Sequence, residues 1–108
     1  RHRRVFRAIR KGLTDLGFRI YISEGEEAEL VAAALYPQDE NWNFERIHDY
    51  CYERGFTIYP GKVENTGMFR LCALGAIDEQ DIEAFFQIFR DALTEYQVSI
   101  PVKYKDNK

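Results

Sequence analysis

A stripe of large apolar side chains near the end of the chain constrains the fold more than any other feature. Apolar residues recur there every three or four positions, which predicts a helix with one continuous apolar side. The stripe comprises Ile82, Phe85, Phe86, Phe89 and Leu93. Asp78 stands where the helix cap belongs, and Glu79 and Asp81 place negative charge in the first turn, where the helix dipole favours it. Such a helix needs an apolar surface to cover it, so we expect the rest of the chain to share one core with it.

The other segments show either helical or strand patterns. Apolar residues at helical spacing precede Gly17, whereas residues 18–22 and 68–73 alternate with the period of two that is typical of strands. The expected order is helix 2–16, strand 18–22, strand 29–36, a helix capped by Asn41 or Asn43 and ended by Gly55, strand 56–59, strand 68–73 and the last helix. We therefore predict an α+β fold with a small antiparallel or mixed sheet of about four strands and helices packed on one face. Residues 1–97 form this domain, and residues 98–108 are expected to be a loose polar tail.

The alternation assigns each strand residue to one of two sheet faces. Phe18, Phe56 and Phe69 are expected to point at the helices. Because successive residues of a strand point to opposite faces, the residues next to them belong to the other face. That set comprises Arg19, Tyr21, Thr57, Tyr59 and Arg70. The second face of the sheet is therefore predicted to be polar and aromatic.

Composition excludes several classes of protein. The 108 residues carry a formal charge of -3, from 15 lysines and arginines against 18 aspartates and glutamates, so general attraction to nucleic acid is not expected. A basic run on the first helix is expected to be a solvated face: Arg3, Arg4, Arg7, Arg10 and Lys11. No apolar run reaches the roughly 18 residues of a membrane span. Cys51 and Cys72 make neither a disulfide framework nor a metal site, which fits a reducing, cytoplasmic setting in which both stay reduced.

Arg70 is the residue with the strongest indication of a function. It lies in the middle of a predicted strand between Phe69 and Leu71, where a charge without a partner is costly. Its planar guanidinium can bind a carboxylate or a phosphonate through two parallel hydrogen bonds. The residue pattern alone favours a simpler alternative, which is an arginine on a solvated sheet face or one that pairs with a nearby glutamate.

The turn at residues 59–62 supplies further candidates. Tyr59, Gly61 and Lys62 follow a predicted strand end, where ligand-contacting loops often lie, so they are candidates for positions near an active site. The Gly-Lys pair lacks the upstream glycine, the following Ser or Thr and the helix of a phosphate-binding loop. Taken alone, the turn is more simply a surface turn. No Ser/His/Asp set, carboxylate pair or cluster of metal ligands is visible, so the sequence offers no catalytic residue and no metal site.

Two segments resemble a known family of enzymes. Residues 55–62 read Gly-Phe-Thr-Ile-Tyr-Pro-Gly-Lys, and residues 69–75 read Phe-Arg-Leu-Cys-Ala-Leu-Gly. At this spacing they resemble the C-terminal small domain of the 2-aminoethylphosphonate–pyruvate aminotransferases, which are class V, fold-type I pyridoxal-phosphate enzymes. The resemblance covers residues 1–97. The Tyr-Pro-Gly-Lys turn is typical of the phosphonate enzymes, whereas Phe-Arg-hydrophobic before a glycine is shared by class V transaminases.

The resemblance implies a reaction and a role for one residue. The arginine of this strand, here Arg70, binds the carboxylate or the phosphonate of the substrate in that family. The implied reaction transfers the amino group of 2-aminoethylphosphonate to pyruvate through pyridoxal phosphate and gives phosphonoacetaldehyde and L-alanine. The Schiff-base lysine and most groups that hold the cofactor belong to a large domain that this sequence lacks, and Lys62 does not correspond to that lysine. The chain alone is therefore expected to be inactive, and the full-length enzyme is expected to be a homodimer.

Two other functions stay open. Another class V transaminase, of the alanine–glyoxylate or serine–pyruvate type, would use the same arginine on an ordinary amino acid, although the turn at residues 59–62 argues against it. A free-standing α+β module would instead bind a small effector or a protein partner on the polar sheet face. The gene upstream of Arg1 distinguishes the two classes, because a large α/β domain with a pyridoxal-phosphate lysine encoded there would support an enzyme.

Overall fold

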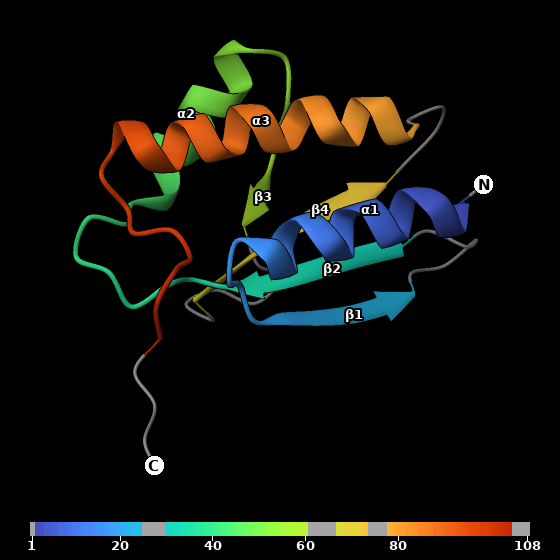
Figure 1. Cartoon of the computed structure of the whole chain (residues 1–108), viewed down its shortest axis with the longest axis horizontal. Coiled ribbons are helices and arrows are strands. Elements are labelled where there is room, and N and C mark those ends of the chain that lie inside the picture. Colours follow the sequence, from blue (N-terminus) through green and yellow to red (C-terminus); the bar gives the residue numbers. More distant parts are fainter. Residues whose placement is uncertain (1, 25–29, 61–66, 74–77, 105–108) are drawn as a thin grey trace.

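The computed structural model describes residues 2–24, 30–60, 67–73 and 78–104 (Figure 1). Three helices and four strands follow one another along this part of the chain. They are α1 (His2–Asp15), β1 (Ile20–Glu24), β2 (Leu30–Leu35), α2 (Phe44–Glu53), β3 (Tyr59–Pro60), β4 (Met68–Ala73) and α3 (Glu79–Glu95). The order of helices and strands is the one that the sequence predicts.

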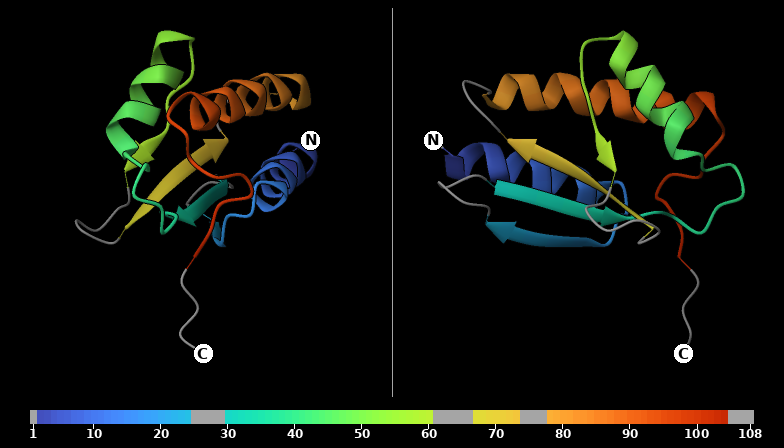
Figure 2. Two further views of the ribbon diagram at one scale, coloured as in Figure 1. Left: turned by 60° about the vertical axis from the view of Figure 1, so that its left-hand side comes forward. Right: turned by 180° about the vertical axis from the view of Figure 1, so that it is seen from behind.

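The four strands form one antiparallel sheet with the order β1-β2-β4-β3. This arrangement confirms the predicted α+β class and selects the antiparallel sheet over a mixed one. Seen from behind, β2 and β4 cross in front of α1, so α1 covers one face of the sheet, and no described helix covers the other, open face (Figure 2). α3 packs against both α1 and α2.

The side chains that face the helices alternate along β2 and β4. Ala32 and Ala34 of β2 are buried, as are Phe69 and Leu71 of β4. The register pairs Ala34 with Phe69, so a small residue stands beside a large one. Five rings surround the Phe69 ring with centroids within 6.4 Å: Phe18, Tyr36, Trp42, Phe44 and Phe89. Because these rings come partly from α2 and α3, those helices cover the same sheet face as α1.

The helix starts are largely those that the sequence predicts. The Asp78 carboxylate accepts a hydrogen bond from the Asp81 N–H at 2.9 Å, and the Asp81 carboxylate accepts one from the Asp78 N–H at 3.1 Å. This capping box satisfies two backbone donors at the start of α3. All five residues of the apolar stripe on α3 are buried. The cap of α2 is Asn43, whose side chain accepts from the Arg46 N–H.

Two strands differ from the predicted bounds by more than one residue. β1 begins later than predicted, because the Phe18 N–H donates back to the Leu13 carbonyl at 3.0 Å. β3 comprises Tyr59–Pro60 instead of residues that begin at Phe56, because the Phe56 N–H donates to the Cys51 carbonyl at 3.0 Å. In both places a hydrogen bond to the preceding helix occupies a backbone group that a strand would use.

Residues 98–104 differ from the loose tail that the sequence predicts. Val102 is buried, and its N–H donates to the carbonyl of Leu16, just after α1, at 2.8 Å. The Tyr104 hydroxyl donates to the carbonyl of Leu35 in β2 at 2.6 Å. These long-range contacts fix the segment against the end of the sheet, and neither partner could be identified from the tail sequence itself. The remaining residues of the predicted tail lie outside the described part.

Asp39 fixes the same segment from the loop before α2. Its carboxylate accepts hydrogen bonds from the N–H groups of Ser99 and Asn41, both at 2.9 Å. Because these bonds favour the charged carboxylate, they lower the pKa of Asp39 below its ordinary value. The stability gained from a lowered carboxyl pKa is complete above the ordinary pKa and is lost as the pH falls through the folded-state pKa.

α1 and α3 approach each other closely at Gly12. A β-carbon at this position would lie 2.4 Å from Cε2 of the Phe86 ring. That ring is buried and packs against Phe85 and Phe89, with centroid distances of 5.0 and 6.1 Å. It cannot move aside without disturbing the apolar stripe, so the missing side chain at position 12 lets the two helices meet.

We expect Gly12→Ala to destabilise the protein even though alanine is the better helix former. The helix preference favours alanine by up to about 1 kcal/mol, whereas overpacking a filled interior costs about 1–3 kcal/mol, so the free energy of unfolding should fall by roughly 1 kcal/mol. Urea unfolding followed by circular dichroism measures this change. The control is the same substitution in a Phe86→Leu background, where most of the penalty should disappear. A more stable Gly12→Ala protein would show that the helices separate without cost.

Candidate functional site

Arg70 lies in the middle of β4, in a row of residues that crosses the sheet. The register pairs it with Tyr59 of β3 on one side and with Ala33 of β2 on the other. Since Phe69 and Leu71 face the helices, this row lies on the opposite, open face, as the alternation predicts. Ala33 contributes only a methyl group beside the arginine, and the Arg70 side chain is half-buried.

Two neutral groups of β3 contact the guanidinium of Arg70. Nε donates to the carbonyl of Pro60 at 3.0 Å, and Cζ lies 6.0 Å from the centre of the Tyr59 ring. Among the residues that the structure describes, no carboxylate lies within ion-pair distance of Arg70. The described part of the chain therefore holds this cation in place without neutralising its charge.

The structure brings two of the predicted site residues together. Tyr59 is 38% exposed and stands opposite Arg70 in the β3–β4 pair. Gly61 and Lys62 lie outside the described residues, and so does the side chain of Tyr21. The Pro60 carbonyl is a contact that the sequence analysis missed. A backbone acceptor carries no residue-type signal, and only the register of β3 against β4 would have revealed it.

The described lysines do not fit the site of a covalently bound pyridoxal phosphate. A lysine with that role needs a sheltered setting in which its amine loses its proton readily. Within the described ranges the lysines are Lys11 and Lys103, and both are exposed. The Nζ atom of Lys11 also lies 2.8 Å from the Asp15 carboxylate, with which it forms an ion pair. The described residues therefore offer no attachment site for the cofactor, and we assign them no step of its chemistry.

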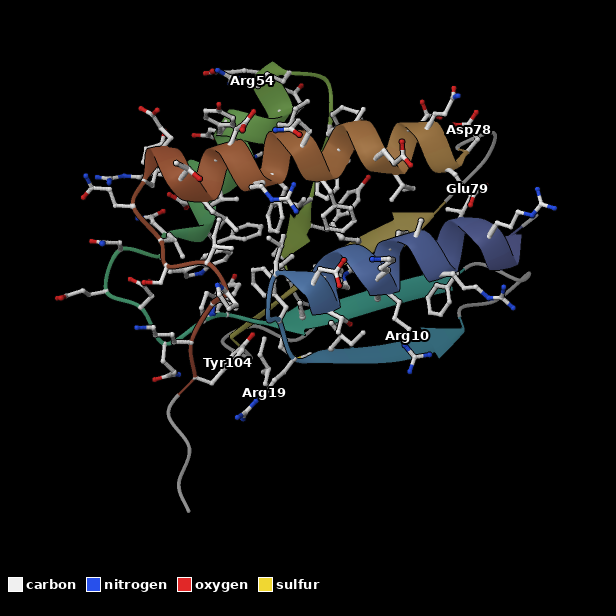
Figure 3. The ribbon with its side chains drawn as sticks, viewed as in Figure 1. Arg10, Arg19, Arg54, Asp78, Glu79 and Tyr104 are labelled. Atoms are coloured by element: carbon white, nitrogen blue, oxygen red, sulfur yellow. The ribbon has the colours of Figure 1, made fainter. Side chains whose placement is uncertain are left out.

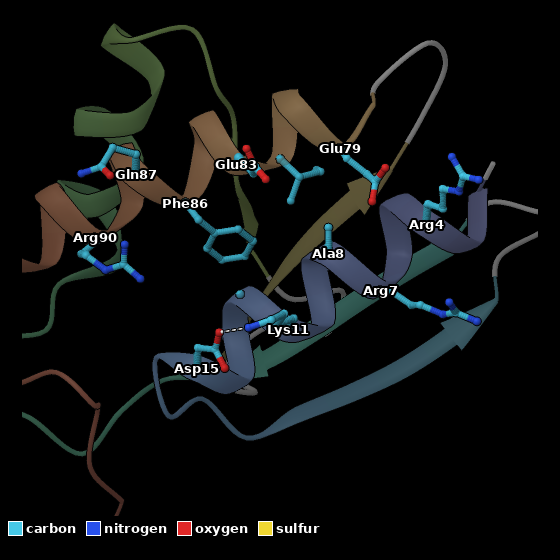
Figure 4. Close-up of a pocket in the computed structure, with 12 residues that line it drawn as sticks. Arg4, Arg7, Ala8, Lys11, Asp15, Glu79, Glu83, Phe86, Gln87 and Arg90 are labelled. Carbon is cyan, nitrogen blue, oxygen red and sulfur yellow. Dashed lines mark hydrogen bonds and ion pairs between the residues drawn. The ribbon is translucent and has the colours of Figure 1, made fainter.

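A groove of about 710 Å³ runs between α1 and α3, and no predicted site residue lines it (Figure 4). Gly12 and Phe86, at the close approach of the helices, are among its lining residues. Its charged lining residues are Arg4, Arg7, Lys11, Asp15, Glu79, Glu83 and Arg90. Because carboxylates and cations share the groove, it does not provide a concentrated positive charge for an anion.

The basic run of α1 is distributed around the helix. Arg7 and Lys11 line the groove, whereas Arg10 points away from α3 (Figures 3 and 4). Arg4, Arg7, Arg10 and Lys11 are all exposed. Their arrangement agrees with the solvated face that the sequence predicts.

Cys51 is not a candidate nucleophile. It faces the core from α2 with 0% exposure and forms no disulfide. Burial raises the pKa of its thiol to about 11, and only the thiolate is a good nucleophile. The side chain of Cys72 lies outside what the structure describes. In the described part of the chain, no cluster of His, Cys, Asp and Glu could hold a metal ion, and no helix combines the length and apolarity needed to cross a membrane.

We expect the Cys51 thiol to react with Ellman's reagent at least about 100-fold more slowly in the native protein than in urea, because its raised pKa leaves few thiolates and burial blocks access. A Cys72→Ser variant makes Cys51 the reporting thiol, and absorbance at pH 8 follows the reaction. The Cys51→Ser variant gives the background from Cys72. Similar rates for Cys51 in the native and unfolded states would contradict a buried, protonated thiol.

The fold and the site define an α+β domain that presents an arginine on the open face of its sheet. Over 83 residues, or 77% of its length, the chain is 34% identical to the 2-aminoethylphosphonate–pyruvate transaminase of Lysinibacillus sphaericus. It is 32% identical to the transaminase of the same name from Lactiplantibacillus plantarum over 84% of its length. It is 28% identical to 2-aminoethylphosphonate–pyruvate transaminase 1 of Cupriavidus pinatubonensis over 93% of its length. No family model matches the chain.

The chain spans about a quarter of the length of these curated relatives, with 22%, 25% and 26% of each covered in turn. This coverage is consistent with one domain of a larger enzyme, such as the C-terminal domain that the sequence resembles. The resemblance to the 2-aminoethylphosphonate–pyruvate transaminases, indicated by the motifs around Tyr59 and Arg70, is thereby confirmed.

Proposed function

We propose that this chain is the substrate-binding C-terminal domain of a larger, pyridoxal-phosphate-dependent aminotransferase. In the proposed reaction, the amino group of 2-aminoethylphosphonate passes to pyruvate and gives phosphonoacetaldehyde and L-alanine. The names of the relatives support the reaction. The observation that carries the domain's role is the Arg70 guanidinium, which neutral groups of the described chain hold on the open sheet face.

In this proposal Arg70 binds the anionic end of each substrate. Pyruvate carries a carboxylate and 2-aminoethylphosphonate carries a phosphonate, and a guanidinium fork can bind either group through two parallel N–H···O bonds. Hydrogen bonds of this charged type contribute about 1.5–3 kcal/mol. The half-buried position of Arg70 supports a strong contact, because partial removal of water strengthens charge interactions.

The cofactor belongs to another part of the proposed enzyme. Pyridoxal phosphate acts as an electron sink when bound, while the protein supplies binding and orientation. Since the described lysines do not fit its attachment site, we propose that a large domain of the same full-length chain holds it and that this chain alone is inactive. A homodimer is the proposed state of the full-length enzyme.

A transaminase for ordinary amino acids is the nearest alternative. Arg70 would bind a carboxylate equally well in an alanine–glyoxylate or serine–pyruvate enzyme. The relatives at 28–34% identity are named for the phosphonate substrate, which favours the phosphonate enzyme. Activity measured with both kinds of amino donor would separate the two possibilities.

We expect Arg70→Ala, in a full-length protein that contains this chain, to lower kcat/KM for 2-aminoethylphosphonate and for pyruvate by about 10- to 150-fold, as loss of a charge-assisted pair predicts. Arg70→Lys should restore only part of this loss, because an ammonium group lacks the planar fork. Steady-state kinetics of both half-reactions measure these changes.

Arg10→Ala is the matched control, because it removes an exposed arginine of α1 that does not belong to the strand row of Arg70, and it should leave both constants unchanged. Cofactor absorbance and thermal unfolding establish that the Arg70 variants keep pyridoxal phosphate and fold. Unchanged kcat/KM in Arg70→Ala would contradict the substrate-binding role. Loss of activity together with loss of the cofactor would instead indicate a structural role and would equally contradict it.

We also expect that this chain alone forms no specific covalent adduct with pyridoxal phosphate. The described lysines are exposed, whereas the attachment of this cofactor needs a sheltered amine. The purified chain, shown by circular dichroism to be folded, is mixed with the cofactor, treated with borohydride and analysed by mass spectrometry. The full-length protein is the positive control. A stoichiometric adduct at one lysine of the isolated chain would show that this domain carries the attachment site.

A further inference from the structure

The contacts of Arg70 restrict how its guanidinium can meet an anion. A guanidinium offers two kinds of edge for a bidentate bond: one that includes Nε, and the end formed by Nη1 and Nη2. The Nε–H of Arg70 already donates to the Pro60 carbonyl at 3.0 Å. The edge that includes Nε is therefore occupied by the protein. Among the described residues nothing binds the terminal edge, which is the one left for a ligand.

The acceptor that takes this Nε–H is itself held firmly. Pro60 pairs with Phe69 across the β3–β4 ladder, and Phe69 is fully buried. The proline ring also fixes one of the two soft backbone angles of that residue. Because Pro60 belongs to the β3–β4 ladder, its carbonyl can orient the guanidinium before any substrate arrives.

Tyr59 adds a second restraint from the residue directly opposite Arg70. Its ring centre lies 6.0 Å from Cζ, at the outer limit of a cation–π contact. The ring and the carbonyl are both neutral, so these two described groups orient the arginine without neutralising its charge. A carboxylate in either position would have oriented the arginine too, but it would have competed with the substrate anion.

We propose that Tyr59 and the Pro60 carbonyl are a positioning device that presents the Nη1–Nη2 end of Arg70 to the substrate carboxylate or phosphonate. Tyr59 is thus a positioning residue that acts through Arg70 and not through the cofactor. This inference rests on the proposed function, since it requires Arg70 to bind substrate. It adds the direction of binding and the residues that set that direction.

The kinetic test is a double-mutant cycle in the full-length protein. Tyr59→Leu should lower kcat/KM for pyruvate about two- to fivefold, the range expected for loss of an exposed cation–π contact. Tyr59→Phe is the conservative variant, and because it keeps the ring it should restore most of this loss. In an Arg70→Ala background, Tyr59→Leu should cause no further loss, because there is no guanidinium left to position.

Three outcomes overturn the inference alone, and a fourth overturns the proposed function together with the inference. An equal loss from Tyr59→Leu in both backgrounds would assign Tyr59 a structural role, and an equal loss in Tyr59→Phe would assign the effect to the hydroxyl. No loss from Tyr59→Leu beside a large loss from Arg70→Ala would show that Arg70 needs no positioning by the ring. If Arg70→Ala itself has no effect, the proposed function fails first, and the inference fails with it.

A crystal structure of the full-length protein with propionate tests the direction of binding without catalysis. Propionate has a carboxylate like that of pyruvate but no keto group to react. We expect its two oxygens on Nη1 and Nη2 of Arg70, with Nε still bound to the Pro60 carbonyl. A carboxylate bound at Nε, with the Pro60 contact broken, would overturn the inference even if Arg70 is confirmed as the substrate-binding residue.

Discussion

The burial of the Phe69 ring determines which face of the sheet carries Arg70. The ring is fully enclosed by aromatic side chains from the loops and from α2 and α3. A shift of β4 by one residue would expose the Phe69 ring and bury the Arg70 guanidinium without a partner. Exposure of the ring and burial of the unpaired charge would each cost on the order of several kcal/mol. The packing of Phe69 in the core therefore fixes the sheet face of Arg70, the next residue along the strand and the candidate for binding.

The two faces of the sheet consequently differ in their surroundings. The face with Ala34 and Phe69 packs against all three helices, and the close approach at Gly12 lets α1 and α3 share that core. The open face carries Arg70 with its neutral neighbours in β3. Because the first face forms the core, core packing does not restrict the side chains of the second face, which can therefore be of types suited to binding.

Local patterns could be read from the sequence, whereas contacts between distant segments could not. The bounds of β4, the Asp78 cap of α3 and the side of the sheet that carries Arg70 follow from alternation, caps and helical spacing. The packing of residues 98–104 depends on partners such as Leu16 and Leu35, which nothing in the tail specifies. The motif around Arg70 indicated the arginine, but its Pro60 partner depends on the register of a two-residue strand.

The charged residues of the molecule show why one cation among many is the candidate for binding. Lys11 is exposed and paired with a carboxylate, and the groove that it lines also contains Glu79 and Glu83. Water and these carboxylates screen the charge there, so an incoming anion would gain little. Arg70 is half-buried, and its described contacts are a carbonyl and a ring, which are neutral. A cation that its described neighbours orient without neutralising it would gain most from an anionic ligand, and this difference makes Arg70, and not the solvated arginines on α1, the candidate for binding.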